Sequence, residues 1–372
     1  MDLTREQVVG HRIAAQQLDR EPSSGRALTD AAILDLGVQD TGRDGASWAL
    51  ANRGVPVASP SALVAADALA LVWSLRVSPH YYRRSQLVDV MTAVSPFGEP
   101  DAARRLRGAA DRVSAIGGGV TEAIGVVAQA QRTLVTSSMV KGELSTRLTA
   151  ELPADYSAWC RPCQVDHVPE SLFRLAALFG GLELEPATSP PVLRRIPGWP
   201  RRAGIASDPE SAPSHLQVVR AYLRLLGPAT PADVAGFLDS TATLIKPYWP
   251  DDAVEVRVEG KKKWLLGEVL EPRPVVRLLG PYDLLAQGKD RDLLVPDPTH
   301  RKQLWPVLGR PGPLLAGGEI VGSWRPRAKG KKLDLEVDHW RPRAVTADDL
   351  GEQAEQLAAH RGLTLGAIRS PG

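Results

Sequence analysis

The stretch at residues 214–249, "SHLQVVRAYLRLLGPATPADVAGFLDSTATLIKPYW", decides the fold prediction because it divides into three short helical segments. Its central turn places Thr230 as a helix cap and Pro231 at the first helical position, the favoured order at a helix start. Residues 253–270 then alternate apolar and polar side chains on both sides of residues 260–262. Helices followed by such a hairpin predict a winged helix-turn-helix whose wing has a basic tip.

The N-terminal residues predict the same architecture. Thr4 and Gln7 form a capping-box pattern that opens a helix over residues 4–20, and three shorter helices are expected to start near residues 30, 44 and 59. Residues 69–84, "LALVWSLRVSPHYYRR", are two β-prone runs around Val77-Ser78-Pro79 and predict a hairpin. We therefore expect an N-terminal winged helix.

The rest of the chain completes an α+β prediction. At 372 residues it exceeds what one hydrophobic core usually serves, so we expect several small domains. Helical stretches with the short strand "GLELEP" are compatible with another winged helix, and a β-rich region with two hairpins and a helix near 346–361 closes the chain. The expected architecture is tandem winged helix-turn-helix units with a C-terminal β-rich region, divided at 1–115, 116–205, 206–272 and 273–372.

Composition is that of an ordinary globular protein, with 43% hydrophobic and 24% charged residues. The first segment lacks the apolar core of a secretory signal and no run reaches membrane-spanning length, so we expect a cytoplasmic, nucleoid-associated monomer with no membrane partner. The 2 cysteines are too few for a disulfide framework, which fits a reducing compartment.

The formal charge of +2 is unevenly distributed. Any single basic cluster is compatible with a solvated face, but clusters gathered on predicted turns and hairpins indicate a nucleic-acid footprint. The clusters lie at residues 83–84, 104–107, 194–202, 261–263 and 325–332. Because winged helices also dock proteins, three classes stay open: an enzyme acting on DNA, a non-catalytic tandem winged-helix DNA-binding regulator, and a protein-docking scaffold.

One short segment between predicted helices suggests chemistry. Residues 36–45, "LGVQDTGRDG", place Gln39, Asp40 and Thr41 side by side. Asp40 can act as a general base or face a developing cation, while Gln39 and Thr41 can each hold a water molecule. The alternative is that Asp40 and Thr41 satisfy backbone groups in a turn.

Six segments, in order along nearly the whole chain, resemble the AlkZ-like winged-helix DNA glycosylases. They are "HRIAAQQL", "DLGVQDT", "LVWSLRVSPHYYRR", "WCRPCQVDHVPESLFRLA", "LLGPYDLLAQGKDRDLL" and "GGEIVGSWRPR". The resemblance implies a bacterial enzyme that removes bulky alkylated purines, and some members give antibiotic producers resistance to their own DNA-alkylating product.

The resemblance also implies roles for particular residues. A Gln-x-Gln or Gln-x-Asp motif positions the catalytic water in that family, and Gln39 matches its first position. This chain departs from the motif with Thr41 at the last position and Asp40 at the usually hydrophobic middle one. In an extended segment residues 39 and 41 face one way and Asp40 the other, whereas a changed bend would turn Asp40 inward. Both arrangements stay open.

The same resemblance assigns the hairpin to probing the duplex near the lesion. It keeps the Arg and His ends of an "RGTxH"-like motif, and its tyrosines suit stacking or, equally, packing. Together with the basic clusters, this predicts DNA contacts for Arg76, His80, Tyr81, Tyr82, Arg83, Arg84, Lys261, Lys262 and Lys263.

The sequence therefore predicts a monofunctional DNA glycosylase that hydrolyses N7-alkylguanine or N3-alkyladenine adducts in double-stranded DNA. Alkylation makes the base a good leaving group, so no metal or organic cofactor is expected. Cys160 and Cys163 with His167 leave a structural zinc one ligand short, and we expect them to have a packing role without metal.

Overall fold

The computed structural model describes residues 1–23, 25–201, 204–341 and 343–370. Arg202, at the end of the predicted basic cluster 194–202, therefore lies outside the described residues. Contacts group the chain into two compact units, each assembled from separate stretches. Unit 1 comprises Met1–Ala66, Tyr222–Asp233 and Pro250–Gly372, and unit 2 comprises Asp67–Ala221 and Val234–Trp249.

Unit 1 combines two sheets with short helices. Its helices are α1 (Arg5–Ala15), α2 (Gly45–Ala51), α3 (Pro60–Val64), α13 (Arg291–Leu294), α14 (Pro298–Leu304), α15 (Ala347–His360) and the 3₁₀ turns η1 (Ala32–Asp35) and η8 (Leu284–Gln287). Its strands are β1 (Asp2–Leu3), β2 (Val38–Gln39), β10 (Val254–Val258), β11 (Lys261–Leu265), β12 (Val276–Leu278), β13 (Gly312–Ala316), β14 (Glu319–Lys329), β15 (Lys332–His339) and β16 (Thr364–Arg369).

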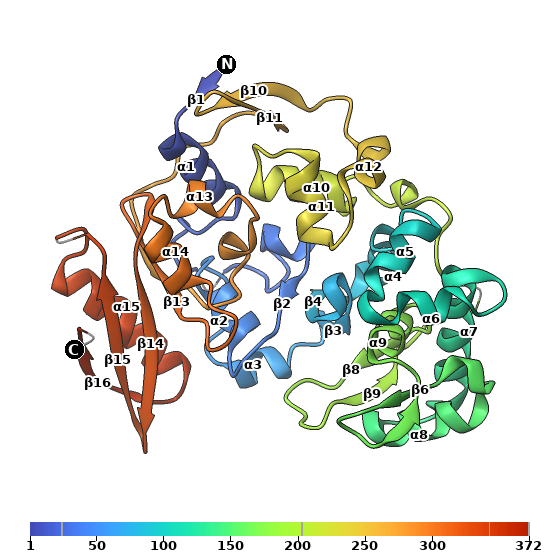
Figure 1. The fold of residues 1–372 in the computed structure, drawn as a ribbon. Helices are drawn as coiled ribbons and strands as arrows, with labels where there is room; N and C mark the ends of the chain where they lie inside the picture. The colour runs from blue at the N-terminus through green and yellow to red at the C-terminus, as the bar shows by residue number, and fades with distance from the viewer. Residues whose placement is uncertain (24, 202–203, 342, 371–372) are drawn as a thin grey trace. The chain divides into compact units, whose positions relative to one another are not determined.

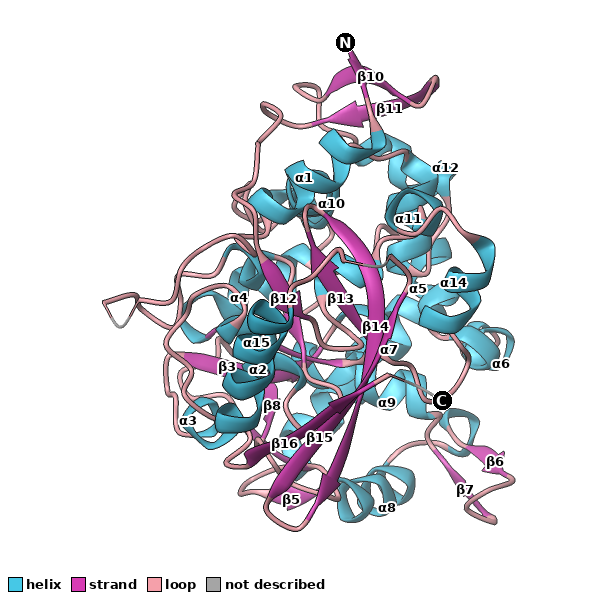
Figure 2. Ribbon diagram, turned by 90° about the vertical axis from the view of Figure 1, so that its left-hand side faces the viewer, coloured by secondary structure: helices cyan, strands magenta, loops and turns pink. Residues whose placement is uncertain are grey.

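A 5-stranded sheet in the order β12-β13-β14-β15-β16 organises the core of unit 1, and Figure 1 shows its strands β13 to β16 in orange to red. Its neighbours are antiparallel except for the parallel pair β15 and β16, and β14 and β15 are its long strands (Figure 2). Leu314 on one face packs with Leu357 of α15, while the adjacent Leu315 packs with Ile13 of α1. Because successive side chains of a strand point to opposite faces, helices cover both sides of this sheet.

The N-terminal helix forms as the sequence predicts but is shorter. Thr4 and Gln7 make the complete capping box at the start of α1. The helix ends at Ala15 rather than residue 20, because Gln17 adopts a left-handed backbone with φ 62°. The helix predicted near residue 30 is a single 3₁₀ turn, η1, whose N-cap has no side-chain hydrogen bond. The helices predicted near 44 and 59 are confirmed as α2 and α3.

The predicted basic hairpin is confirmed, but its turn lies elsewhere. Strands β10 and β11 are antiparallel, and β1 adds to β10 in a 3-stranded sheet. The turn consists of Glu259 and Gly260, with φ of 47° and 76°, the positive pair typical of a two-residue hairpin loop. Residues 261–263 therefore lie on β11 and not at the tip.

Helices α10 (Val218–Leu226) and α11 (Pro231–Leu238) each have residues in both units. The predicted start of α11 is confirmed: Thr230 Oγ1 accepts a hydrogen bond from the Asp233 backbone N–H at 3.2 Å, and Pro231 is the first helical residue.

Unit 2 packs helices around an antiparallel sheet. Its helices are α4 (Leu87–Ala93), α5 (Glu99–Arg105), α6 (Ala110–Ser114), α7 (Gly119–Leu134), α8 (Lys141–Glu151), α9 (Glu170–Phe179), α12 (Ala242–Ile245) and the 3₁₀ turns η2 (Leu75–Val77), η3 (Arg84–Gln86), η4 (Arg107–Ala109), η5 (Ala154–Tyr156), η6 (Pro209–Ser211) and η7 (Lys246–Tyr248). Its strands are β3 (Leu69–Trp73), β4 (Pro79–Arg83), β5 (Met139–Val140), β6 (Ala158–Cys160), β7 (Val165–His167), β8 (Leu182–Leu184) and β9 (Val192–Arg195).

The hairpin predicted at residues 69–84 is confirmed as β3 and β4, paired from Leu69 with Arg83 to Trp73 with Pro79. The strand order continues β4-β3-β8-β9-β5, so the predicted strand "GLELEP" lies next to this hairpin. Phe173 of α9 meets Trp73 edge-on at 6.1 Å between ring centroids, which fixes the helix against the sheet.

The mixture of helices and sheets confirms the α+β class. The tandem winged-helix units and the four consecutive segments stay predictions. Within the described ranges, no single helix is long and apolar enough to span a membrane, and one helix pair, 107–114 with 119–134, passes that test jointly but is bent by 98°.

Candidate active site

Gln39, Asp40 and Thr41 follow one another in unit 1 at and beyond the end of β2, and all three are partly exposed. Gln39 Nε2 donates a hydrogen bond to Thr41 Oγ1 at 2.9 Å. Residues 39 and 41 therefore share one side of the segment, the arrangement expected of extended backbone. A carboxamide and a hydroxyl placed together in this way can both orient a water molecule.

The Asp40 carboxylate contacts the start of the next helix. Its Oδ1 accepts a hydrogen bond from the backbone N–H of Ala46 in the first turn of α2, at 3.2 Å. Between them Gly42 has φ 90°, a left-handed conformation that glycine adopts without strain and that lets the chain turn back toward α2. One of the two carboxylate oxygens of Asp40 thus satisfies a backbone N–H, as expected if the segment has the structural role of a turn.

The surroundings of Asp40 change its acidity. Burial raises the pKa of this carboxyl, the Ala46 N–H lowers it, and the negative charge of Asp44 raises it again, with a net increase. A carboxylate with a raised pKa is a stronger base than an ordinary aspartate. Asp44 is itself held by Arg361, whose Nε and Nη2 donate to its two oxygens at 2.5 and 3.1 Å. Sequence patterns could not reveal this pair, because its members lie 317 residues apart.

In unit 2, three residues of the hairpin predicted to contact DNA are buried. His80, Tyr81 and Tyr82 are only 1%, 3% and 1% exposed. The Ser74 hydroxyl lies 3.2 Å from His80 Nδ1 and 2.9 Å from the Tyr82 hydroxyl, which ties the two rings into one network. In this conformation the three side chains pack inside unit 2, which is the packing alternative left open by the sequence.

The arginines of the hairpin are more accessible. Arg76 has φ 56°, and its guanidinium lies 4.3 Å from the centre of the Phe237 ring, a cation–π contact. Arg83 and Arg84 are half-buried. Arg84 pairs with Glu183 at 2.8 Å and also donates to backbone carbonyls, so a phosphate would have to compete with these partners.

The three lysines of β11 differ in exposure. Lys261 and Lys262 are exposed, with carboxylates of Asp292 and Glu255 at 3.7 and 2.5 Å. Lys263 is 5% exposed, and its ammonium instead lies between Asp233 and Asp290 at 3.1 and 2.7 Å. The sequence predicts a phosphate contact for Lys263, but its burial and its two carboxylate partners correct this to a structural ion-pair role.

The family model described as "DNA glycosylase AlkZ-like" matches residues 33–360. The chain belongs to the AlkZ-like DNA glycosylase family. It is a DNA glycosylase, an enzyme class of DNA repair, and the resemblance of the six sequence segments is confirmed. The solved structure of the Streptomyces sahachiroi DNA glycosylase AlkZ is similar, with a TM-score of 0.74 over 100% of both chains at 21% identity, which supports the fold. No curated protein matches the sequence.

Several residues in the family-like segments hold this glycosylase together. Arg12 of "HRIAAQQL" donates to Asp290 of "GPYDLLAQGKD" at 3.0 and 2.7 Å, within the same network as Lys263. Although burial alone would raise the pKa of Asp290, Arg12 and Lys263 hold it well below its usual range. Arg53 and Asp283 form a second fully buried pair, with hydrogen bonds of 2.8 and 2.9 Å. These charges anchor the fold of unit 1.

Proposed function

We propose that this glycosylase removes N7-alkylguanine or N3-alkyladenine adducts from double-stranded DNA by attack of water on the N-glycosidic bond at Gln39, Asp40 and Thr41. The observation that carries the proposal is the hydrogen bond of 2.9 Å between Gln39 and Thr41, next to a carboxyl whose pKa is raised. Gln39 and Thr41 orient the water from the side they share, and we infer that the bend held by the Asp40–Ala46 hydrogen bond brings the Asp40 carboxylate to the same water to accept its proton.

The reaction needs few catalytic groups besides these three, because alkylation already activates the base as a leaving group. Alkylation at N7 or N3 gives the base a positive charge, so the C1′–N bond breaks with its electron pair leaving on the base. The water oxygen bonds to C1′, and its proton passes to the Asp40 carboxylate. The same carboxylate stabilises the positive charge that develops on the sugar in the transition state. This sequence of steps uses no metal or organic cofactor.

The wider biological assignment belongs to the same proposal. Self-resistance to a DNA-alkylating product, a monomeric state and a location in the cytoplasm with the nucleoid all derive from the family resemblance and the composition. The exposed Lys261 and Lys262 and the half-buried Arg76, Arg83 and Arg84 are the proposed phosphate contacts.

Single-turnover excision of 7-methylguanine, or of bulkier adducts if that base is inert, from a labelled duplex tests the proposal. Gln39→Ala and Asp40→Asn should each slow base release by about tenfold or more, corresponding to ~1.4 kcal/mol of activation barrier. Thr41→Ala should have a comparable effect, because the threonine hydroxyl holds the Gln39 amide. Folding and duplex binding should be nearly unchanged.

The exposed Gln303→Ala and Asp251→Asn make the same chemical changes away from the motif and should excise at the parental rate. If the three motif variants also excise at the parental rate, the water is activated elsewhere and residues 39–41 form only a turn. If the parent binds duplexes tightly but releases no base from any adduct, a non-catalytic regulator describes the chain better.

A further inference from the structure

Strands β6 and β7 form a small hairpin that carries both cysteines of the chain. Cys160 ends β6, Cys163 lies in the turn, and His167 ends β7. The backbone N–H of Gln164 donates to the carbonyl of Cys160 at 2.8 Å, and Gln164 has φ 56°. A non-glycine residue in the left-handed region is uncommon, and here it closes the turn that follows the Cys-x-x-Cys segment.

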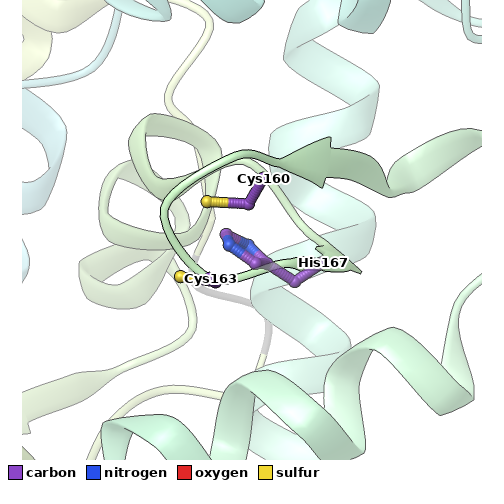
Figure 3. Close-up of side chains that lie close together, drawn as sticks. All are labelled: Cys160, Cys163 and His167. Atoms are coloured by element: carbon purple, nitrogen blue, oxygen red, sulfur yellow. The ribbon is translucent and has the colours of Figure 1, made fainter.

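The hairpin brings three metal-binding side chains together. The sulfur atoms of Cys160 and Cys163 and a ring nitrogen of His167 all lie within 4.8 Å of one another. Figure 3 shows the three side chains turned toward one another from the two strands and the turn. This separation is close to the ligand spacing of a tetrahedral zinc ion, whose bonds to sulfur and nitrogen are about 2.3 and 2.0 Å.

The histidine is already oriented as a metal ligand would be. His167 Nδ1 lies 2.8 Å from the carbonyl oxygen of Val168, so Nδ1 carries the proton and donates to that oxygen. The lone pair is thereby left on Nε2. Metal-binding histidines usually donate their second ring nitrogen to a backbone carbonyl or a carboxylate in this way, which fixes both the tautomer and the ring orientation.

Packing does not explain this hairpin. Cys163 is exposed and Cys160 half-buried, and the neighbouring Trp159 and Val165 are 60% and 53% exposed. The packing role expected from the sequence is therefore corrected, because neither thiol enters a core. A lone two-stranded hairpin is marginally stable in water, so an additional crosslink would stabilise it.

We propose that Cys160 Sγ, Cys163 Sγ and His167 Nε2 bind one zinc ion, with an exchangeable water in the fourth position. Two thiolates and an imidazole favour zinc among the common divalent cations. The nearby carboxylate of Glu170 is already paired with Lys141 at 2.7 Å and with Arg174 at 2.5 Å, so water takes the remaining position. The ion clips the two strands together, and the site is independent of the proposed excision chemistry.

Cobalt and zinc titrations of the untagged full-length chain test the site. The protein is reduced, stripped of metal and titrated with Co²⁺ and then with excess Zn²⁺. One equivalent of Co²⁺ should produce sulfur-to-cobalt charge-transfer absorption and the intense bands of tetrahedral Co²⁺, and Zn²⁺ should abolish both. Hydrogen exchange of the backbone amides at residues 158–167 should slow by about tenfold or more when zinc is added.

Matched variants assign the ligands. Cys160→Ser and Cys163→Ser should abolish the charge-transfer band at one equivalent, and His167→Asn should weaken zinc binding by about tenfold or more. His339→Asn, at an exposed histidine of unit 1, should bind as the parent does. Circular dichroism confirms that each variant is folded before it is titrated.

Two results would overturn the proposal. The first is a reduced, folded parent that gives no charge-transfer band and retains no zinc after dialysis. The second is a zinc stoichiometry and affinity that the cysteine and histidine variants leave unchanged, which would place the ion elsewhere.

Discussion

Asp40 has a structural role and, in the proposed mechanism, a chemical role, and the two place opposite demands on it. Its Oδ1 accepts the Ala46 N–H, which stabilises the start of α2. Partial burial and the nearby charge of Asp44 nevertheless make its ionised form less favourable than that of an ordinary aspartate. A residue chosen for stability alone would be an asparagine, which keeps the acceptor oxygen without the charge. The presence of a carboxylate rather than an amide at this position fits the proposed chemical role.

Replacement of Asp40 by Asn should therefore separate stability from activity. At pH 7.5 the variant should melt about 1–2 °C higher than the parent while excising more slowly, because the desolvated charge is gone and the acceptor remains. Because the pKa of Asp40 is raised, ionisation of its carboxyl makes the parent less stable than the variant. This difference is absent below the unfolded-state pKa of about 3.9 and develops as pH rises through the folded-state pKa. The difference in melting temperature should thus shrink toward pH 4.5.

Thermal unfolding at both pH values, with Asp251→Asn as the exposed control, measures this difference. A variant that is less stable than the parent at pH 7.5 would show that the ionised carboxylate is favourable in the fold, contrary to the direction of the pKa change.

At the level of elements, the position of one turn determines which lysines can reach DNA. Because the loop of the β10–β11 hairpin is Glu259–Gly260, Lys261 lies next to the loop and Lys263 two positions farther along the strand. Lys263 pairs in register with the buried Val256 and enters the ion-pair network of Asp290. A run of basic residues in a sequence can therefore include side chains, such as Lys263, that are buried and do not add charge to the surface.

Removal of Lys261 and Lys262 should weaken binding to all duplexes regardless of sequence. Each lost phosphate contact should reduce the slope of log affinity against log salt by about 0.9. Lys263→Ala should leave that slope unchanged and lower the free energy of unfolding by about 1–3 kcal/mol, because Asp233 and Asp290 lose a partner. Fluorescence anisotropy across salt concentrations and urea unfolding distinguish the two effects.

The double variant Lys246→Ala/Lys302→Ala removes the same charge from exposed positions outside the basic clusters and is the control. An unchanged salt slope in the Lys261/Lys262 variant would place the DNA away from this hairpin.

For the whole molecule, the sequence predicted local structure well and long-range partners poorly. Capping at Thr4 and Thr230 and the hairpin at residues 69–84 depend on neighbouring residues, and all three are confirmed. Unit 1 is assembled from three separated stretches of the chain, and β15 pairs in parallel with β16. Both features depend on contacts between residues that are distant in the sequence. No local periodicity records such contacts.

In the candidate site, too, local features could be expected from the sequence and long-range contacts could not. The shared side of Gln39 and Thr41 is one of the two arrangements that the sequence left open, whereas the ion pair of Asp44 with Arg361 was not predicted. The burial of His80, Tyr81 and Tyr82 could not be distinguished from exposure on a wing, because both locations use aromatic residues in alternating strands.

Two buried histidines should make the whole protein sensitive to acid. His80 of unit 2 is 1% exposed; burial, with a smaller effect of the Arg76 charge, lowers its pKa to about 3, partly opposed by its hydrogen bond to Ser78. His11 of unit 1 accepts the Leu270 N–H at Nδ1, and burial lowers its pKa to about 4. On unfolding, both imidazoles return to a pKa of about 6.5 and take up protons that the folded state does not bind.

Their contribution to stability is therefore fully present above about pH 6.5 and is lost as pH falls toward the folded-state values, by up to ~1.4 kcal/mol per pH unit for each histidine. Urea unfolding at pH 7.5, 6.0 and 5.0 should show this decline, analysed separately for the two units if they unfold in separate transitions. His80→Asn should be less stable than the parent at pH 7.5, but its free energy of unfolding should fall less between pH 7.5 and 5.0 in unit 2, because one titrating histidine is gone. The exposed His339→Asn should keep the parental pH dependence. A parent whose free energy of unfolding is flat between pH 7.5 and 5.0 would mean that these histidines take up protons over the same pH range in the folded as in the unfolded state, so that the effect of burial is offset by partners beyond Ser78 and Leu270.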